Sequence, residues 1–253
     1  MFVKTMTEQT TDFGFEKVTK SEKTHRVTDV FSSVATEYDL MNDIMSFGIH
    51  RLWKRHAINL CAIRENYHVL DVAGGTGDMS KLIHQKLGDE GQVTLCDVNQ
   101  KMLKQGRDNF INKGIITGIN YVQANVEALP FNDQSFDCIT IAFGLRNVTD
   151  KETALRSMYS KLKYGSQLLI LEFSKVVLPI LDKIYDQYSF RMIPKFGKLV
   201  AKDEASYQYL VESIRMFPDQ KALSLMMEEA GFEKIDYHNL SGGIVAIHRG
   251  FKL

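Results

Sequence analysis

The sequence has no surplus of charge of either sign, since 31 Lys and Arg residues balance 31 Asp and Glu residues over 253 residues. Binding of nucleic acid through bulk electrostatics depends on a positive surplus, so we expect no nucleic-acid partner. Hydrophobic residues make up 44% of the chain and charged residues 25%, as is ordinary for a soluble globular protein. A chain of this length can bury a sizeable core unaided, and we expect one domain over residues 1–253.

Cysteine is scarce, and its spacing gives no ligand pattern. The three cysteines, Cys61, Cys96 and Cys138, lie far apart and form no C-x-x-C or Cys/His spacing. We therefore predict reduced thiols packed as small apolar residues, no metal site and a cytoplasmic location.

Long apolar runs are also missing. The first 25 residues are polar and mixed in charge, and they lack the apolar stretch of a signal peptide. The longest apolar runs, at 168–171 and 176–181, are far shorter than the ~18–20 residues that a membrane span requires. Any membrane contact is therefore expected to be peripheral, at the inner membrane.

From residue 68 onward, short apolar runs alternate with stretches of helical periodicity. Strands are predicted at 68–73, 92–97, 120–123, 137–142 and 167–173, and helices at 79–87, 100–112 and 151–162. This alternation indicates βαβ units with right-handed crossovers and a mostly parallel sheet. Two strand-like runs at 231–240 and 243–251 are joined by Ser241 and two glycines, which predicts an antiparallel hairpin. The predicted fold class is therefore α/β, with seven strands and a terminal hairpin.

The segments around this core have patterns of their own. Residues 1–57 are predicted to be an N-terminal arm, loose up to about residue 20, followed by two or three short cap helices interrupted at 46–48. The core spans 58–175. Residues 176–217 are rich in Tyr, Phe, Met and Lys and too long for a plain connection, so extra helices are predicted there. Residues 218–253 would hold the last helix and the hairpin.

Three glycines within four residues follow the first predicted strand of the core. Gly74, Gly75 and Gly77 stand between this strand and the next helix, where the absence of a Cβ lets the backbone turn tightly and approach a ligand. Asp71 and Asp78 flank them, and a carboxylate beside a pyrophosphate would be repulsive. The loop therefore favours a cationic ligand without phosphate. S-adenosylmethionine fits, because it carries an ammonium, a sulfonium and a ribose.

The next two predicted strands end in residues that suit a nucleoside. Asp97 lies 23 residues beyond Gly74, and a carboxylate there can accept hydrogen bonds from both ribose hydroxyls. This feature alone fits NAD as well as S-adenosylmethionine. Asn125 and Val126 follow the third strand, at the sheet edge where ligands bind, and are predicted to meet the edge and the face of the adenine.

These residues together resemble the class I S-adenosylmethionine-dependent methyltransferases, which have a Rossmann-like fold. More narrowly, the sequence resembles the UbiE family of quinone-ring C-methyltransferases. The resemblance covers nearly the whole chain, in motifs that no fold alone demands, at 13–15, 38–54, 71–78, 125–130, 143–148, 171–175, 185–188, 206–207, 212–215 and 218–220.

The resemblance implies methylation of a polyprenylated quinol, demethylmenaquinol or 2-methoxy-6-polyprenyl-1,4-benzoquinol, in menaquinone or ubiquinone biosynthesis. It implies cofactor contacts from Thr76, Asp97 and the pair Asn125 and Val126, and backbone contact from Ala142, where the family commonly has serine. Residues 58–175 would then bind the cofactor, and the helices of 176–217 would cover the quinol. A homodimer or a quinone-biosynthesis complex is a further expectation.

Methylation of an aromatic carbon needs an electron-rich ring, which loss of a hydroxyl proton supplies. The pKa of a phenol is near 10, so the site must stabilise the phenolate or provide a base. Arg146 and Asn147 follow the fourth predicted strand, at the edge that holds the cofactor loops. We predict that Arg146 stabilises the phenolate and that Asn147 orients it, while a structural ion pair would account for Arg146 equally well. His50, Asp39 and Tyr188 are weaker candidates.

Other functions stay open at this point. One is a methyltransferase acting on another small aromatic or lipid acceptor. A second is a nicotinamide-dependent oxidoreductase, against which the acids beside the glycines and the terminal hairpin argue. A third is a non-catalytic subunit that keeps the cofactor fold.

Overall fold

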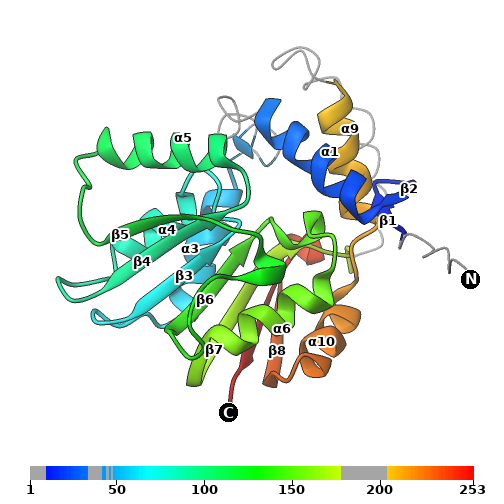
Figure 1. Cartoon of the computed structure of the whole chain (residues 1–253). Helices are drawn as coiled ribbons and strands as arrows, with labels where there is room; N and C mark the ends of the chain where they lie inside the picture. Colours follow the sequence, from blue (N-terminus) through cyan, green and yellow to red (C-terminus); the bar gives the residue numbers. More distant parts are fainter. Residues whose placement is uncertain (1–9, 34–41, 44–45, 47, 178–203) are drawn as a thin grey trace, which may run out of the picture.

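A sheet of seven strands forms the centre of the molecule (Figure 1). The computed structural model describes residues 10–33, 42–43, 46, 48–177 and 204–253. The strand order is β5-β4-β3-β6-β7-β9-β8. In chain order the strands are β3 (His68–Val72), β4 (Gln92–Asp97), β5 (Ile119–Gln123), β6 (Phe136–Ala142), β7 (Leu162–Phe173), β8 (Glu233–Leu240) and β9 (Val245–Phe251).

The pairing confirms the predicted sheet. All neighbours from β5 to β7 are parallel, and β9 runs antiparallel to both β7 and β8. The predicted terminal hairpin therefore exists as β8 and β9, with β9 inserted between β7 and β8. The direction of progression along the sheet reverses at β3, which has β4 on one side and β6 on the other. In such sheets the crevice at this reversal, outside the carboxyl ends of the strands, is where ligands bind.

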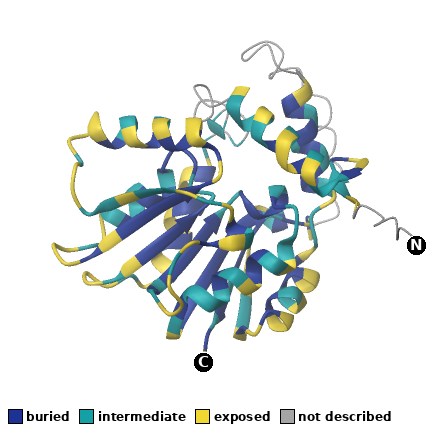
Figure 2. Cartoon of the chain, in the orientation of Figure 1, coloured by how far each residue is buried: buried dark blue, intermediate teal, exposed yellow. Residues whose placement is uncertain are grey.

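Helices cover both faces of the sheet. On one face lie α3 (His50–Leu60), α4 (Asp78–His84) and α5 (Gln100–Ile111), and on the other α6 (Lys151–Lys161) and α10 (Gln220–Glu229). Because both faces are covered, the central strands have nearly continuous apolar sequences. Figure 2 shows this burial in the central strands, whereas the outer sides of the helices are exposed. No described helix is long and apolar enough to cross a membrane.

The N-terminal residues include a small hairpin, so the prediction of a loose arm up to about residue 20 was wrong for residues 10–19. β1 (Thr10–Phe13) pairs antiparallel with β2 (Glu16–Thr19), and Gly14 in the turn has φ +59. The hairpin packs on α9 (Glu204–Arg215), where the ring of Phe13 stacks on Tyr209 with 4.1 Å between centroids. Its partner is thus about two hundred residues away, which local periodicity cannot indicate.

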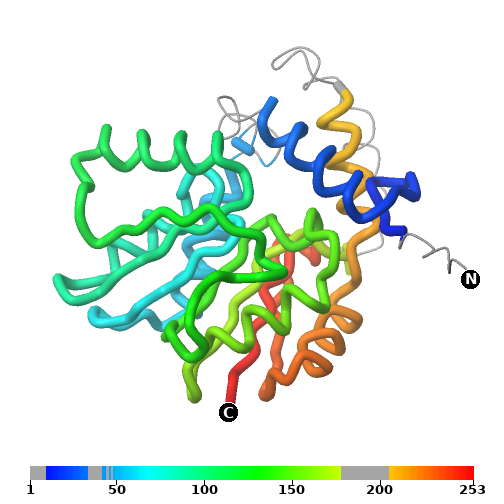
Figure 3. The backbone as a smooth tube through the Cα atoms, in the orientation of Figure 1, coloured from blue at the N-terminus to red at the C-terminus, as the bar shows by residue number. Residues whose placement is uncertain are grey.

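Two helices from opposite ends of the chain lie together above the carboxyl ends of the strands (Figures 1 and 3). α1 (Lys20–Ser33) follows the hairpin, and its Ser33 Oγ lies 3.4 Å from Ser206 Oγ of α9. Of the predicted cap helices, α1 and α3 are found, and residues 34–41, 44–45 and 47 lie outside the described residues. Of the predicted inserted helices, α9 is found and residues 178–203 lie outside the described residues.

Candidate functional site

The glycine loop joins β3 to α4 at the crevice. A Cβ on Gly74 would lie 2.2 Å from Leu95 Cδ1, and one on Gly77 would lie 2.6 Å from Phe110 Cε2. These two glycines are therefore needed for close packing of the loop against β4 and α5. Gly75 has φ +56, a left-handed conformation that glycine adopts without strain, and it lines the cavity at the crevice. Of the three glycines, Gly75 is the one that lines the cavity.

A cavity opens at this crevice, which is where small-ligand sites lie in sheets of this kind. It is lined by the glycine loop, by the residues that follow β4, β5 and β6, and by one side of α1. The residues from α1 are Thr24, Val27, Thr28 and Phe31. The described residues that line the cavity include the carboxylates Asp97 and Glu127 and no Lys, Arg or His. Its charge therefore suits a cation and disfavours a phosphate.

Asp97 is held in place by backbone donors. Its Oδ2 accepts a hydrogen bond from Gly75 N at 2.9 Å, and its Oδ1 accepts one from Asn99 N at 2.8 Å. Burial raises the pKa of Asp97 to about 6, against the opposing effect of these backbone hydrogen bonds. The carboxylate is therefore mostly ionised at neutral pH, and it retains lone pairs that can accept two ribose hydroxyls.

Asn125 and Val126 line the cavity where β5 ends. Asn125 Oδ1 accepts a hydrogen bond from Glu127 N at 3.0 Å and caps the short helix η1 (Val126–Ala128). Val126 is buried and presents an apolar surface. The pair thus offers a polar edge and a flat apolar contact, which suits a purine base.

The two acids that flank the glycines have other partners. Asp71 is fully buried and accepts hydrogen bonds from Ser80 Oγ at 2.6 Å and Thr140 Oγ1 at 2.9 Å. Burial raises the pKa of Asp78, but the Lys54 ammonium, 2.9 Å from Asp78 Oδ2, brings it below the ordinary value. Neither acid lines the cavity. The negative charge that faces the ligand comes from Asp97 and Glu127 instead.

Arg146 lies in the short helix η2 (Leu145–Asn147), and its guanidinium is buried in an ion pair. Its Nη1 lies 2.9 Å from Glu172 Oε1 and also donates to the carbonyl of Phe143. The guanidinium stands over the ring of Phe173, 5.4 Å from its centroid. Arg146 Nε is buried without a hydrogen-bond partner. The side chain does not line the cavity.

Asn147, the next residue, does line the cavity. Its Oδ1 accepts a hydrogen bond from the hydroxyl of Tyr209 at 3.1 Å. Of the two residues predicted for the chemistry, the structure thus brings Asn147 to the cavity and places Arg146 directly behind it.

Four other predicted cofactor contacts lie beside the cavity rather than on its lining, namely Gly74, Thr76, Gly77 and Ala142. Thr76 is buried, and its carbonyl accepts a hydrogen bond from Asn109 at 3.3 Å. Ala142 packs against the apolar cluster beneath α3. His50 is buried as well, with Nε2 2.8 Å from Asp43 Oδ1. Burial lowers the pKa of His50. Asp39 and Tyr188 lie outside the described residues.

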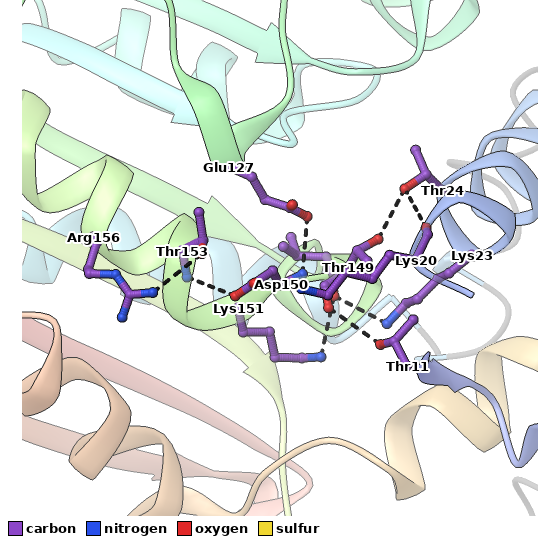
Figure 4. A network of polar contacts seen from close by, with 11 residues as sticks. Thr11, Lys20, Lys23, Thr24, Glu127, Thr149, Asp150, Lys151, Thr153 and Arg156 are labelled. Carbon is purple, nitrogen blue, oxygen red and sulfur yellow. Dashed lines mark hydrogen bonds and ion pairs between the residues drawn. The ribbon is translucent and has the colours of Figure 1, made fainter. Parts of the chain in front are cut away.

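Cap helices were predicted within residues 1–57, but the contacts that hold α1 beside the cavity were not. Three side chains of α1 contact the residues that follow η2 (Figure 4). Lys20 Nζ donates a hydrogen bond to Asp150 Oδ2 at 3.0 Å, and Lys23 Nζ donates one to the Val148 carbonyl at 3.2 Å. Thr24 Oγ1 lies 3.2 Å from Thr149 Oγ1. Burial lowers the pKa of Lys23 to about 8. The apolar positions of α1 were visible as a helical pattern, but their target was not.

Asn99 was also missed, although it stands directly before the predicted helix of 100–112. Its Oδ1 caps α5 by accepting hydrogen bonds from Lys101 N and Met102 N. Its Nδ2 donates to Thr28 O at 3.1 Å and to Ser32 Oγ at 2.9 Å in α1. An Asn before a helix is a capping signal, and this signal could have identified the residue.

Comparison with known sequences places the chain among quinone-ring methyltransferases. The sequence model of the ubiE/COQ5 methyltransferase family matches residues 17–252. The chain is 60% identical to the ubiquinone/menaquinone biosynthesis C-methyltransferase UbiE of Pectobacterium atrosepticum, over 97% of this chain and 98% of that protein. It is 59% identical to the protein of the same name from Serratia proteamaculans, with the same coverage.

Solved structures share the fold of this chain. An S-adenosylmethionine-dependent methyltransferase from Thermotoga maritima aligns with 89% of this chain and 99% of its own at 19% identity and a TM-score of 0.63. One from Aquifex aeolicus aligns with 79% of this chain and 89% of its own at 15% identity and a TM-score of 0.59. The Rossmann-like fold expected from the sequence is confirmed.

Proposed function

This chain belongs to the ubiE/COQ5 methyltransferase family, and from that premise we propose that it transfers a methyl group from S-adenosylmethionine to a ring carbon of a polyprenylated quinol. The names of its relatives point to ubiquinone and menaquinone biosynthesis. The acceptors are accordingly 2-methoxy-6-polyprenyl-1,4-benzoquinol, demethylmenaquinol or both. The observation that carries the proposal is the cavity at the sheet reversal, whose described lining holds two carboxylates and no cationic side chain.

The donors and acceptors around the cavity fit S-adenosylmethionine. Gly75 leaves room for the ligand to approach the backbone, since a Cβ there would face only Met102 Cε at 3.0 Å. Asp97, already oriented by two backbone N–H groups, would accept the ribose hydroxyls. Asn125 and Val126 would contact the adenine. When bound, S-adenosylmethionine supplies an electrophilic methyl group on a sulfonium.

The residues of this chain prepare the acceptor ring. Asn147 would donate a hydrogen bond from its amide to the developing phenolate oxygen, which favours the charged form and lowers its pKa. Phe143 and Val148 line the same cavity and exclude water, so that each polar contact acts in a low dielectric. Holding the ring carbon in line with the methyl group contributes a large share of the acceleration.

Arg146 contributes from behind the cavity. Its charge is largely balanced by Glu172, so its long-range effect on a phenolate is reduced. The same pair supports the turn that carries Asn147, because Glu172 Oε2 accepts Arg146 N at 3.2 Å and Arg146 Nη1 holds the Phe143 carbonyl. We therefore propose that Arg146 stabilises the phenolate indirectly, because it supports the turn that carries Asn147.

The direct test is transfer of a labelled methyl group. The protein is incubated with methyl-labelled S-adenosylmethionine and with each quinol in turn, and the product is analysed for label on the ring. Label in at least one quinol is expected. Binding of S-adenosylmethionine with no transfer to either quinol would contradict the proposed acceptor. Binding of NAD in its place, measured by calorimetry, would favour an oxidoreductase.

Replacing Asp97 by Asn tests the cofactor site. The charge and one ribose acceptor are lost, so we expect the affinity for S-adenosylmethionine to fall roughly 10- to 100-fold in calorimetric titration. Asp89→Asn, in an exposed loop, is the matched control and should bind as the wild type does. Unchanged affinity in Asp97→Asn would remove Asp97 from the site.

The acceptor also bears on where the protein works. A polyprenyl tail partitions into a bilayer, so we propose peripheral contact with a membrane surface, tested by flotation with lipid vesicles. A homodimer or a complex with other quinone-biosynthesis enzymes stays a prediction of the sequence, which analytical ultracentrifugation can test for the dimer.

A further inference from the structure

The hydrogen bond between Tyr209 and Asn147 connects helix α9 to the short helix η2. Tyr209 belongs to α9, and Asn147 belongs to η2 at the cavity. The phenol hydroxyl donates to Asn147 Oδ1 at 3.1 Å. Tyr209 is 5% exposed, and burial raises its pKa to about 12, so the hydroxyl stays protonated and remains a donor.

The N-terminal hairpin contacts the ring that carries this hydroxyl and so helps to fix the position of the hydroxyl. The ring of Tyr209 stacks on Phe13 with an interplanar angle of 14°. One turn further along α9, Glu212 Oε2 accepts a hydrogen bond from Phe15 N at 3.2 Å. Gly14 at the tip of the hairpin would clash with Glu212 if it carried a Cβ, at 2.2 Å from Oε2. The hairpin therefore fixes the position of α9, and α9 in turn fixes the position of the Tyr209 hydroxyl.

A carboxamide has an acceptor oxygen on one side and a donor nitrogen on the other. If the Asn147 amide flipped, its nitrogen could still donate to the hydroxyl oxygen, but the buried hydroxyl proton of Tyr209 would then have no acceptor among the described residues. The oxygen is thus directed to α9, and the amide nitrogen is left as the group that can act in the cavity. A phenolate needs a donor, so this is the orientation that the chemistry requires.

We propose that Tyr209 is a positioning residue for methyl transfer, holding the Asn147 carboxamide so that its nitrogen donates to the oxygen of the acceptor ring. This inference rests on the proposed function, because it assigns the donor that meets a phenolic acceptor. It also gives the N-terminal hairpin a part in the reaction, since the hairpin supports the ring of Tyr209.

Tyr209→Phe is the test, because it removes the hydroxyl and keeps the ring on Phe13. We expect kcat to fall roughly 5- to 10-fold, the value of one hydrogen bond, with the affinity for S-adenosylmethionine unchanged. The acid limb of the kcat profile should move to higher pH, since the phenolate is less well stabilised. Tyr237→Phe on β8, at the far edge of the sheet, is the control and should change neither quantity.

The double variant shows whether Tyr209 acts through Asn147. If it does, Tyr209→Phe combined with Asn147→Ala will be no slower than Asn147→Ala alone. Losses that multiply, or a Tyr209→Phe enzyme as fast as the wild type, would overturn the inference while the proposed function stands. If the wild type methylates neither quinol, the proposed function fails. A neutron crystal structure of Tyr209→Phe, which distinguishes the carboxamide nitrogen from its oxygen, then decides the role of Tyr209, and an Asn147 carboxamide with unchanged orientation would overturn it.

Discussion

The ion pair of Arg146 and Glu172 is the residue-scale feature that supports the conformation of η2. Both side chains are almost completely buried, and Glu172 Oε1 also accepts a hydrogen bond from Phe173 N at 2.9 Å. A buried pair adds little stability over an apolar pair, but removing one partner leaves the other charge without compensation. The conformation of η2 therefore requires both residues.

Replacing Arg146 by Ala should destabilise the protein by about 3–5 kcal/mol, because Glu172 would remain buried without its cation. The free energy of unfolding in urea measures this loss. Arg146→Met combined with Glu172→Gln removes both charges and keeps an acceptor at 172, so it should recover most of the stability. A single Arg146→Ala variant as stable as the wild type would show that Glu172 has another compensating partner.

At the scale of elements, α1 closes the cavity that the sheet opens. The residues of α1 that line the cavity are spaced three or four apart, so they share one side of the helix. The helix is attached through Lys20, Lys23 and Thr24 on one side of the cavity and through Asn99 on the other.

Two substitutions of Asn99 separate its tether to α1 from its cap of α5. Asn99→Ser keeps a good N-cap but loses the amide that donates to Thr28 and Ser32. We expect faster hydrogen exchange in α1 alone for Asn99→Ser, and in both α1 and the start of α5 for Asn99→Ala. Equal protection of α1 in Asn99→Ser and in the wild type would mean that the tether does not hold the helix.

At the scale of the whole molecule, two buried carboxyl groups should shape the pH dependence of stability. Burial raises the pKa of Asp71 and of Asp97 to about 6 each, against about 3.9 in an unfolded chain. Between these values the folded state binds more protons than the unfolded state. Each group therefore contributes stability that is present below about pH 4 and is lost as the pH rises through 6.

The difference between the wild type and Asp71→Asn isolates one of these groups. From about pH 3 to about pH 7 the unfolding free energy of the wild type should fall by about 3 kcal/mol relative to that of Asp71→Asn, and then stay level. Urea unfolding at several pH values measures both. The exposed control Asp89→Asn should run parallel to the wild type. A difference for Asp71→Asn that rises over this range would reverse the assigned direction of the pKa shift.

Local sequence patterns were enough to predict the sheet, the glycine loop and the position of Asp97 at the end of a strand, because each depends on residues that are close together in the chain. Apolar runs separated by helical stretches predicted β3 to β7, and two glycines between apolar runs predicted the hairpin of β8 and β9. Asp97 could be identified because it ends a strand, and all strand ends of a parallel sheet share one edge.

Which side chains line the cavity depended on the tertiary structure. Asp71 and Asp97 both lie near the ends of strands, yet only Asp97 lines the cavity, because Asp71 points beneath the loop to Ser80 and Thr140. The partners of Arg146 and Asn147 lie 26 and 62 residues further along the chain. Val148, whose carbonyl accepts a hydrogen bond from Lys23 of α1, lies 125 residues further along the chain. Periodicity describes a residue's own element, whereas these contacts arise where distant elements pack together.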